Sequence, residues 1–175
     1  LTHDHLDYHK NFDAYFASKL GLFKRVLSPE GSVVINMDDA RGHEIHEISK
    51  LRGQDIITVG QHNCDLTLKK CNFDATGQQI LFSWHDEIKS IRLDLIGYFQ
   101  AMNILQAAAL VIACGEQPNN VFDTLSELKT VSGRMQLAAK RANGASIFVD
   151  YAHTPDAVET ALKAMRPHVM GRLLI

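Results

Sequence analysis

The feature that most constrains the fold is a strongly apolar helical segment at residues 98–114. A helix that is apolar on nearly all sides must be covered by other layers of the fold, because water does not stabilise its surface. Gln100, Asn103 and Gln106 interrupt this segment at three-residue steps and form a narrow polar stripe. A buried amide must be hydrogen-bonded, either by the backbone or by a ligand with donor and acceptor edges such as a purine. The pattern by itself leaves both possibilities open.

The segments before this helix supply candidate layers. Polar and apolar residues alternate between residues 65 and 97, with turn residues at 75–77 and 84–86, which predicts an antiparallel meander. Spacing and composition also predict the elements that precede the meander: a helix at 12–27, a strand at 32–36, a helix at 40–51 and a strand at 55–60. The fold class is therefore α/β.

A second unit is predicted near the end of the chain. A helix at 119–129 and a hairpin-like segment at 137–144 lead to a buried-type strand at 146–150. Thr154 and Pro155 then cap and start a helix, and residues 172–175 begin another strand. Strand, helix and strand in this order predict a right-handed βαβ unit with a parallel strand pair. We expect the domain boundary between residues 130 and 145.

Composition excludes several classes of function. The net charge is only −2, with 22% charged residues, so the chain has no basic field for nucleic acid. No apolar run approaches the roughly 20 residues that cross a bilayer. Three cysteines without a CxxC pair indicate reduced thiols. We therefore expect a cytoplasmic protein with no nucleic-acid partner and no membrane insertion. Because the chain starts at Leu1 and stops inside a predicted strand, we expect part of the protein to lie outside it.

The first residues are rich in metal-ligand side chains. Three histidines and two aspartates fall within residues 3–9, and imidazole and carboxylate groups bind metals. One interpretation is a metal-dependent hydrolase that uses His3, His5 and His9. Its HxHxDH motif is not met, because Tyr8 occupies the last histidine position and His9 follows one residue late. The other interpretation is that several of these groups only solvate a loop.

Lys19 lies on the apolar stripe of the predicted helix at 12–27, one turn after Tyr15 and Phe16. A lysine in this position often buries its stem and extends its ammonium group into water. Alternatively, a low dielectric favours the neutral amine, which is a nucleophile. The spacing does not decide between these two interpretations.

Two further segments are candidates for nucleotide binding. Asp150 lies at the carboxyl end of a predicted strand, where open α/β sheets collect ligands, and His153 follows closely. The carboxylate could bind ribose hydroxyls and the imidazole could stack on a base, or the segment could only cap the next helix. Arg134, after Gly133 in the predicted interdomain loop, has the forked donors that bind phosphate.

Six motifs resemble the Mur ligase family in order and spacing. They are His-Asp-His-Leu-Asp-Tyr-His at 3–9, the Tyr15-to-Lys19 helix, Asn-Met-Asp-Asp at 36–39, Gly-Tyr-Phe-Gln-Ala-Met-Asn at 97–103, Ser-Gly-Arg-Met at 132–135 and Asp-Tyr-Ala-His-Thr-Pro-Asp-Ala at 150–157. The last motif favours the members that add the third residue of the peptide. The resemblance implies that residues 1–132 are the second half of a P-loop-type ATPase central domain with an antiparallel sub-sheet. Residues 133–175 would then start a Rossmann-like C-terminal domain.

The resemblance also implies a reaction, ATP-dependent amide ligation in peptidoglycan precursor synthesis. ATP would phosphorylate the terminal carboxylate of UDP-MurNAc-L-Ala-D-Glu, and the amine of a diamino acid would attack the acyl phosphate. Meso-diaminopimelate is expected more than L-lysine, and the enzyme is expected to be a monomer. The family's P-loop, GTxGKT followed by Ser or Thr, is not found in these 175 residues. We therefore expect the fragment alone to be inactive, and a non-catalytic nucleotide-binding module is the alternative.

Site residues follow from the same resemblance. Lys19 matches a lysine that CO₂ carbamylates into an anionic Mg²⁺ ligand, and His5 matches a ligand of the second Mg²⁺. For ATP, Asn103 matches an adenine contact, Arg134 a phosphate contact and Asp150 a ribose contact. Tyr151 and His153 are placed near the nucleotide. Two residues depart from the family pattern: Gln100, where Asn is common, and Gln136, where Glu is usual.

Overall fold

The computed structural model describes residues 9–175 of the chain. A five-stranded sheet has the order β1-β2-β3-β4-β5, and β6 and β7 form a separate two-stranded sheet. The strands are β1 Ser32–Asn36, β2 Asp55–Gly60, β3 Leu66–Asp74, β4 Gly77–Trp84, β5 Glu87–Leu93, β6 Gln136–Lys140 and β7 Ser146–Val149. The α-helices are α1 Phe12–Gly21, α2 Gly42–Leu51, α3 Tyr98–Ala113, α4 Pro118–Thr124 and α5 Pro155–Met165.

The five-stranded sheet is mixed. β1 and β2 pair in parallel, β2 and β3 pair in parallel over two residues, and β3, β4 and β5 form an antiparallel meander. Alternation explains these strands, since Val33 and Ile35 of β1 are buried between half-buried neighbours. The predicted strands at 32–36 and 55–60 and the predicted meander are confirmed.

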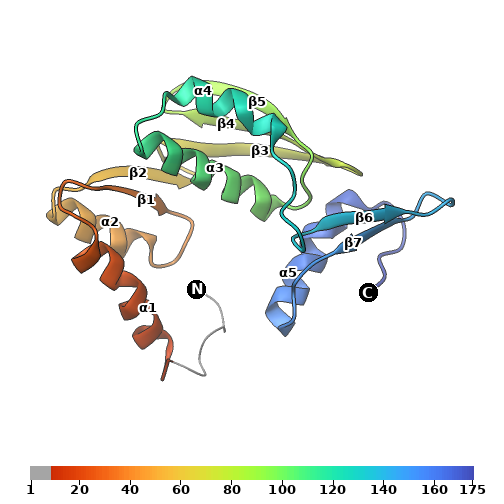
Figure 1. Cartoon of the computed structure of the whole chain (residues 1–175), viewed down its shortest axis with the longest axis horizontal. Helices are drawn as coiled ribbons and strands as arrows, with labels where there is room; N and C mark the ends of the chain where they lie inside the picture. The colour runs from red at the N-terminus through yellow and green to blue at the C-terminus, as the bar shows by residue number, and fades with distance from the viewer. Residues whose placement is uncertain (1–8) are drawn as a thin grey trace.

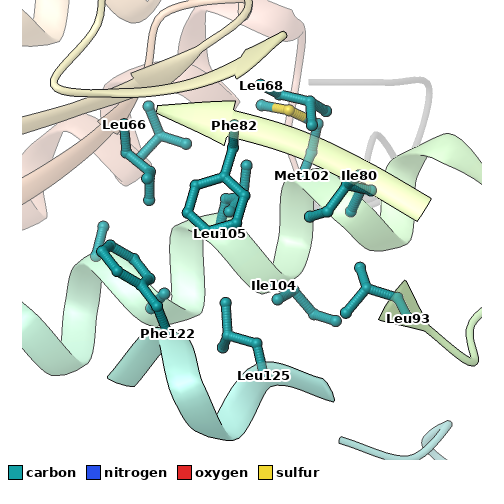
Figure 2. Packing of buried hydrophobic residues seen from close by; sticks show 14 of the residues in the cluster. Leu66, Leu68, Ile80, Phe82, Leu93, Met102, Ile104, Leu105, Phe122 and Leu125 are labelled. Atoms are coloured by element: carbon teal, nitrogen blue, oxygen red, sulfur yellow. The ribbon is translucent and has the colours of Figure 1, made fainter. Parts of the chain in front are cut away.

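The main core lies between this sheet and the helices α3 and α4. Figure 2 shows Phe82 of β4 facing Leu105 of α3 and Phe122 of α4, and the two phenylalanine rings meet edge to face at 5.2 Å. The opposite side of α3 is open: Leu110 is 54% exposed and Val111 is 47% exposed. The expectation that this helix is covered on all sides is therefore wrong within residues 9–175, because α4 covers only part of its outer surface.

The first helix continues as a π-helical turn, Leu22–Val26. Asn11 caps α1 by accepting a hydrogen bond from the backbone N–H of Ala14 at 2.9 Å. None of the helices in residues 9–175 is long and apolar enough to span a bilayer.

The second unit contains the β6–β7 hairpin and α5, and lies at the other end of the molecule from α1 and α2 (Figure 1). Thr154 caps α5 through the N–H of Ala157 at 3.3 Å, and Pro155 occupies the first turn, as predicted. A small core of Ile96, Met135 and Met165 joins this unit to the rest of the chain.

The predicted strand at 172–175 is not formed, so the predicted parallel pair with β7 is wrong for the described residues. The Arg166 guanidinium binds the carbonyl groups of Val169 and Gly171, which turns the chain after α5. Leu174 is 76% exposed, so the last residues gain little from burial. A strand this short is stable only against a partner strand, and within residues 9–175 β7 pairs only with β6.

Candidate functional site

A cavity of about 620 Å³ lies between the first turns of α3 and the segment that leads into the second unit. Phe99 and Ile104 supply apolar walls, while Gln100, Asn103 and Arg134 supply polar groups. Pockets for small organic ligands commonly have this size and this mixture of apolar walls and few polar groups. Gln100 in the first turns of α3 and Arg134 are 34 residues apart in the chain, and the fold brings them together here.

The polar stripe of α3 divides into two environments. The Gln106 amide donates to the carbonyl of Met102 at 3.2 Å, so the helix backbone satisfies it. Gln100 Nε2 lies 3.5 Å from the carbonyl of Arg134 and links the two walls of the cavity. Asn103 is exposed to the cavity, and within residues 9–175 its amide has no hydrogen-bond partner. The sequence left open whether these amides bond to the backbone or to a ligand. Gln106 bonds to the backbone, and the Asn103 amide is available for a ligand.

Arg134 lies in a sharply turned loop. Gly133 has φ +70° and Met135 has φ +50°, so left-handed backbone precedes and follows the arginine. Two hydrogen bonds to Gln136 Oε1 hold the start of this loop, from the Gly133 N–H at 3.0 Å and from the Ser132 hydroxyl at 3.2 Å. The guanidinium itself is exposed, with its carbon 5.8 Å from the ring centroid of Tyr151.

Asp150 fastens the same loop to the end of β7. One carboxylate oxygen accepts the N–H of Met135 at 2.8 Å, and the other accepts the N–H of Ala152 at 2.8 Å. Tyr151 adds a backbone hydrogen bond from its N–H to the Gly133 carbonyl at 2.8 Å. Asp150 therefore orients the loop of Arg134, while the cavity is lined by Arg134 and the α3 amides.

Among the described residues, His153 is not one of those that line the cavity. Its Nδ1 is 2.8 Å from the carbonyl of Tyr151, and its ring meets the Tyr151 ring edge to face at 5.2 Å. Tyr151 thus contacts both Arg134 and His153. The structure brings Asn103 and Arg134 to one cavity, and places Asp150, Tyr151 and His153 behind the arginine loop.

Lys19 does not lie in a low-dielectric site in this chain. Its side chain is exposed on α1, with the ammonium group 4.9 Å from the ring centroid of Tyr15. Of the two interpretations left open by the sequence, this placement favours the first, in which the stem follows Tyr15 and the charge reaches water. His9 stacks on the same ring at 5.0 Å.

The predicted metal ligands His3 and His5 lie outside the described residues, so the relation of His5 to Lys19 is not placed. Within residues 9–175, no group of three or more His, Cys, Asp or Glu side chains could hold a metal ion.

Sequence reasoning missed His168, which joins the two units. Its ring contacts residues far away in the chain, and a single histidine after a helix carries no local signal of such a role. The motif at 36–39 forms a turn in which Asn36 Oδ1 accepts the N–H of Asp38 at 2.9 Å. Asp38 then accepts the N–H of Gln61 at 3.0 Å, which ties the carboxyl ends of β1 and β2 together.

Comparison with known proteins gives a consistent result. Residues 1–111 match the Mur ligase middle domain, and residues 133–175 match the Mur ligase glutamate ligase domain. The UDP-N-acetylmuramoyl-L-alanyl-D-glutamate–2,6-diaminopimelate ligase of Zymomonas mobilis is 40% identical over 175 residues, which are all of this chain and 36% of that protein.

Solved structures agree with the sequence matches. A UDP-N-acetylmuramoyl-L-alanyl-D-glutamate–2,6-diaminopimelate ligase superimposes with a TM-score of 0.78 at 28% identity, covering 97% of this chain and 34% of the other. The MurF ligase of Thermotoga maritima in complex with ADP has the same fold, with a TM-score of 0.77 at 23% identity over 94% of this chain and 36% of the other. This chain spans about a third of the length of the curated relatives that it matches. These matches show that the chain belongs to the Mur ligase family.

Proposed function

We propose that the whole protein is an ATP-dependent ligase that joins meso-diaminopimelate to UDP-MurNAc-L-Ala-D-Glu. The observation that carries the proposal is the cavity lined by both Arg134 and Asn103, whose amide has no hydrogen-bond partner among residues 9–175. It is supported by membership in the Mur ligase family and by the diaminopimelate ligases among the relatives. L-lysine is the competing diamino acid. We also propose that the protein is a monomer in the cytoplasm. Its domain boundary is proposed to divide residues 1–132 from residues 133–175.

In this proposal the cavity holds ATP. Phe99 and Ile104 would contact the adenine ring, and the donor and acceptor of the Asn103 amide would bind its edge. The exposed guanidinium of Arg134 would bind phosphate oxygens through paired N–H donors. Each Asp150 oxygen retains a lone pair beside its backbone hydrogen bond, so a ribose hydroxyl can donate to it. His153 and Tyr151 would bound the nucleotide behind Arg134.

We further propose that Lys19 is carbamylated in the intact enzyme. Its amine is exposed and reachable by CO₂, and the carbamate would be an anionic oxygen ligand for Mg²⁺ together with His5. Bound Mg²⁺ stabilises negative charge where phosphate and carboxylate react. The remaining ligands would come from outside residues 9–175, since these residues hold no complete metal-ligand group.

The test is a ligation assay with the full-length protein. We expect phosphate release that requires ATP, Mg²⁺, UDP-MurNAc-L-Ala-D-Glu and meso-diaminopimelate together, with the ligated product identified by mass spectrometry. Replacing meso-diaminopimelate with L-lysine should lower the rate strongly. ATP binding without any ligation would instead indicate a non-catalytic nucleotide-binding protein. The 175-residue chain alone should show no ligation.

Two variants in the same assay test the placement of ATP. Asn103→Ala should raise the KM for ATP about tenfold, because the hydrogen bonds of one amide contribute roughly 1–2 kcal/mol. Gln106→Ala is the matched control, because this amide lies one turn away on α3 and already bonds to the Met102 carbonyl. Equal effects of the two changes on the KM for ATP would contradict the proposed site.

A further inference from the structure

His168 connects the second unit to two separate parts of the first. It follows α5 at the end of the short 3-10 turn Arg166–His168, and it is only 6% exposed. Its Nδ1 lies 2.6 Å from the backbone carbonyl oxygen of Asp74, at the end of β3. Its Nε2 lies 3.0 Å from the backbone nitrogen of Gly97, just before α3. Both ring nitrogens are therefore used across the boundary between the units.

These two partners define the chemical state of the ring. A carbonyl oxygen can only accept a hydrogen bond, so Nδ1 must carry the proton. A backbone N–H can only donate, so Nε2 must offer its lone pair. Only the neutral imidazole with its proton on Nδ1 satisfies both contacts. The ring also meets Phe73 edge to face at 5.0 Å, which fixes its plane.

Gly97 is a sensitive point at which to hold α3. Its φ is +97°, which side-chain-bearing residues rarely adopt, and a Cβ here would lie 2.9 Å from the Cβ of Ala164 on α5. Its carbonyl oxygen accepts hydrogen bonds from Gln78 Nε2 at 2.8 Å and from the Gln100 N–H at 3.1 Å. The second unit thus contacts the residue from which α3 begins, and Gln100 and Asn103 follow within two turns.

The same contact region also holds the arginine loop. Met135, the residue after Arg134, is 3% exposed and packs with Ile96 and Met165. Ile96 directly precedes Gly97, so this small core and the His168 hydrogen bond act on adjacent residues. The start of α3 and the loop of Arg134 form the two walls of the cavity. Both are therefore held by the same contact between the units.

We propose that His168 is a positioning residue for the nucleotide cavity. By accepting the N–H of Gly97, its neutral ring sets the first turns of α3 relative to the loop of Arg134, and so sets the distance between the adenine and phosphate contacts. This inference rests on the proposed binding of ATP in the cavity. His168 itself does not touch the nucleotide.

The experiment compares His168→Gln with His168→Asn in the full-length enzyme. The glutamine amide reaches the position of Nε2, where its oxygen can accept the Gly97 N–H. The shorter asparagine amide reaches the position of Nδ1, where it can donate to the Asp74 carbonyl but leaves Gly97 unpaired. We expect His168→Gln to keep the KM for ATP within about twofold and His168→Asn to raise it about tenfold, with kcat changed much less.

Several controls separate positioning from loss of stability. His85→Gln and His85→Asn change an exposed histidine and should leave the KM for ATP unchanged. Thermal unfolding should respond similarly to both His168 variants, so only positioning predicts a difference between them in KM. Equal KM values for the two His168 variants overturn the inference while leaving ATP ligation intact. A wild-type protein that binds no ATP overturns the proposed function as well.

A measurement on the unmodified protein covers the case in which neither variant folds. The Gly97 amide should exchange its hydrogen more slowly when ATP is bound, because ATP stabilises the arrangement that His168 holds. An exchange rate at Gly97 that ATP leaves unchanged overturns the inference.

Discussion

Gln136 shows how one side chain can preserve a loop while departing from the pattern of its family. Its amide oxygen accepts hydrogen bonds from the Gly133 N–H and the Ser132 hydroxyl. A glutamate oxygen could accept the same two bonds, because both partners are donors. The missing charge therefore does not remove the support of the Arg134 loop.

This contact predicts a difference between two substitutions in the full-length protein. Gln136→Leu leaves the part-buried Gly133 N–H without its acceptor, so the KM for ATP should rise about fivefold, a loss of about 1 kcal/mol. Gln136→Glu keeps the acceptor and should stay close to wild type. Steady-state kinetics with varied ATP measures both, and a larger defect in the glutamate variant would contradict this role.

The sequence predicted some residues of the site and not others. Asn103 and Arg134 could be chosen because they lie in short motifs, and they do line one cavity. Asp150 was predicted to contact ribose, and the sequence did not reveal that both of its oxygens also accept backbone N–H groups. His168 could not be found, because its partners Gly97 and Asp74 are 71 and 94 residues away in the chain.

At the scale of elements, sequence patterns predicted the helices and strands that depend on interactions between residues close together in the chain. The meander from β3 to β5 follows from period-two alternation and its turn residues, and α5 follows from Thr154 and Pro155. The strand expected at 172–175 failed because a strand depends on a partner edge that local sequence does not specify. The prediction that α3 is covered on all sides was wrong for a similar reason, since composition does not say which elements will pack on the helix.

The cap of α5 gives a prediction at this scale. Thr154→Ala removes the acceptor of the Ala157 N–H and should destabilise the first turn by about 1 kcal/mol. Amide hydrogen exchange in that turn of the full-length protein should then accelerate about fivefold. Thr160→Ala, in the middle of the same helix, is the matched control. Its hydroxyl donates only to the Asp156 carbonyl, so exchange should not accelerate there.

At the scale of the molecule, two units share one small set of contacts. The larger core between the sheet and α3 belongs to the first unit, while Ile96, Met135 and Met165 form the core of the junction. The sequence predicted a boundary near residues 130–145, but not the surfaces that meet across it. Such surfaces are made by residues distant in sequence, and periodicity carries no information about them.

Asp74 is central to this junction. Its side chain closes the β3–β4 turn by accepting the N–H groups of Thr76 and Gly77, at 2.8 and 3.1 Å. Arg92 of β5 pairs with the same carboxylate and holds its pKa well below the usual range, so the group stays ionised at neutral pH. The backbone carbonyl of Asp74 remains directed to His168.

This arrangement has a consequence for the order in which the chain folds during synthesis. Asp74 leaves the ribosome 94 residues before His168, which is roughly 5–20 s at typical rates of translation. A hairpin forms in about 1–10 μs, so the turn is complete long before its partner appears. Pulsed hydrogen exchange on ribosome-bound chains of increasing length should find β4 protected while Gly97 still exchanges freely. If β4 and Gly97 become protected at the same chain length, the hairpin does not form before the C-terminal unit that binds it.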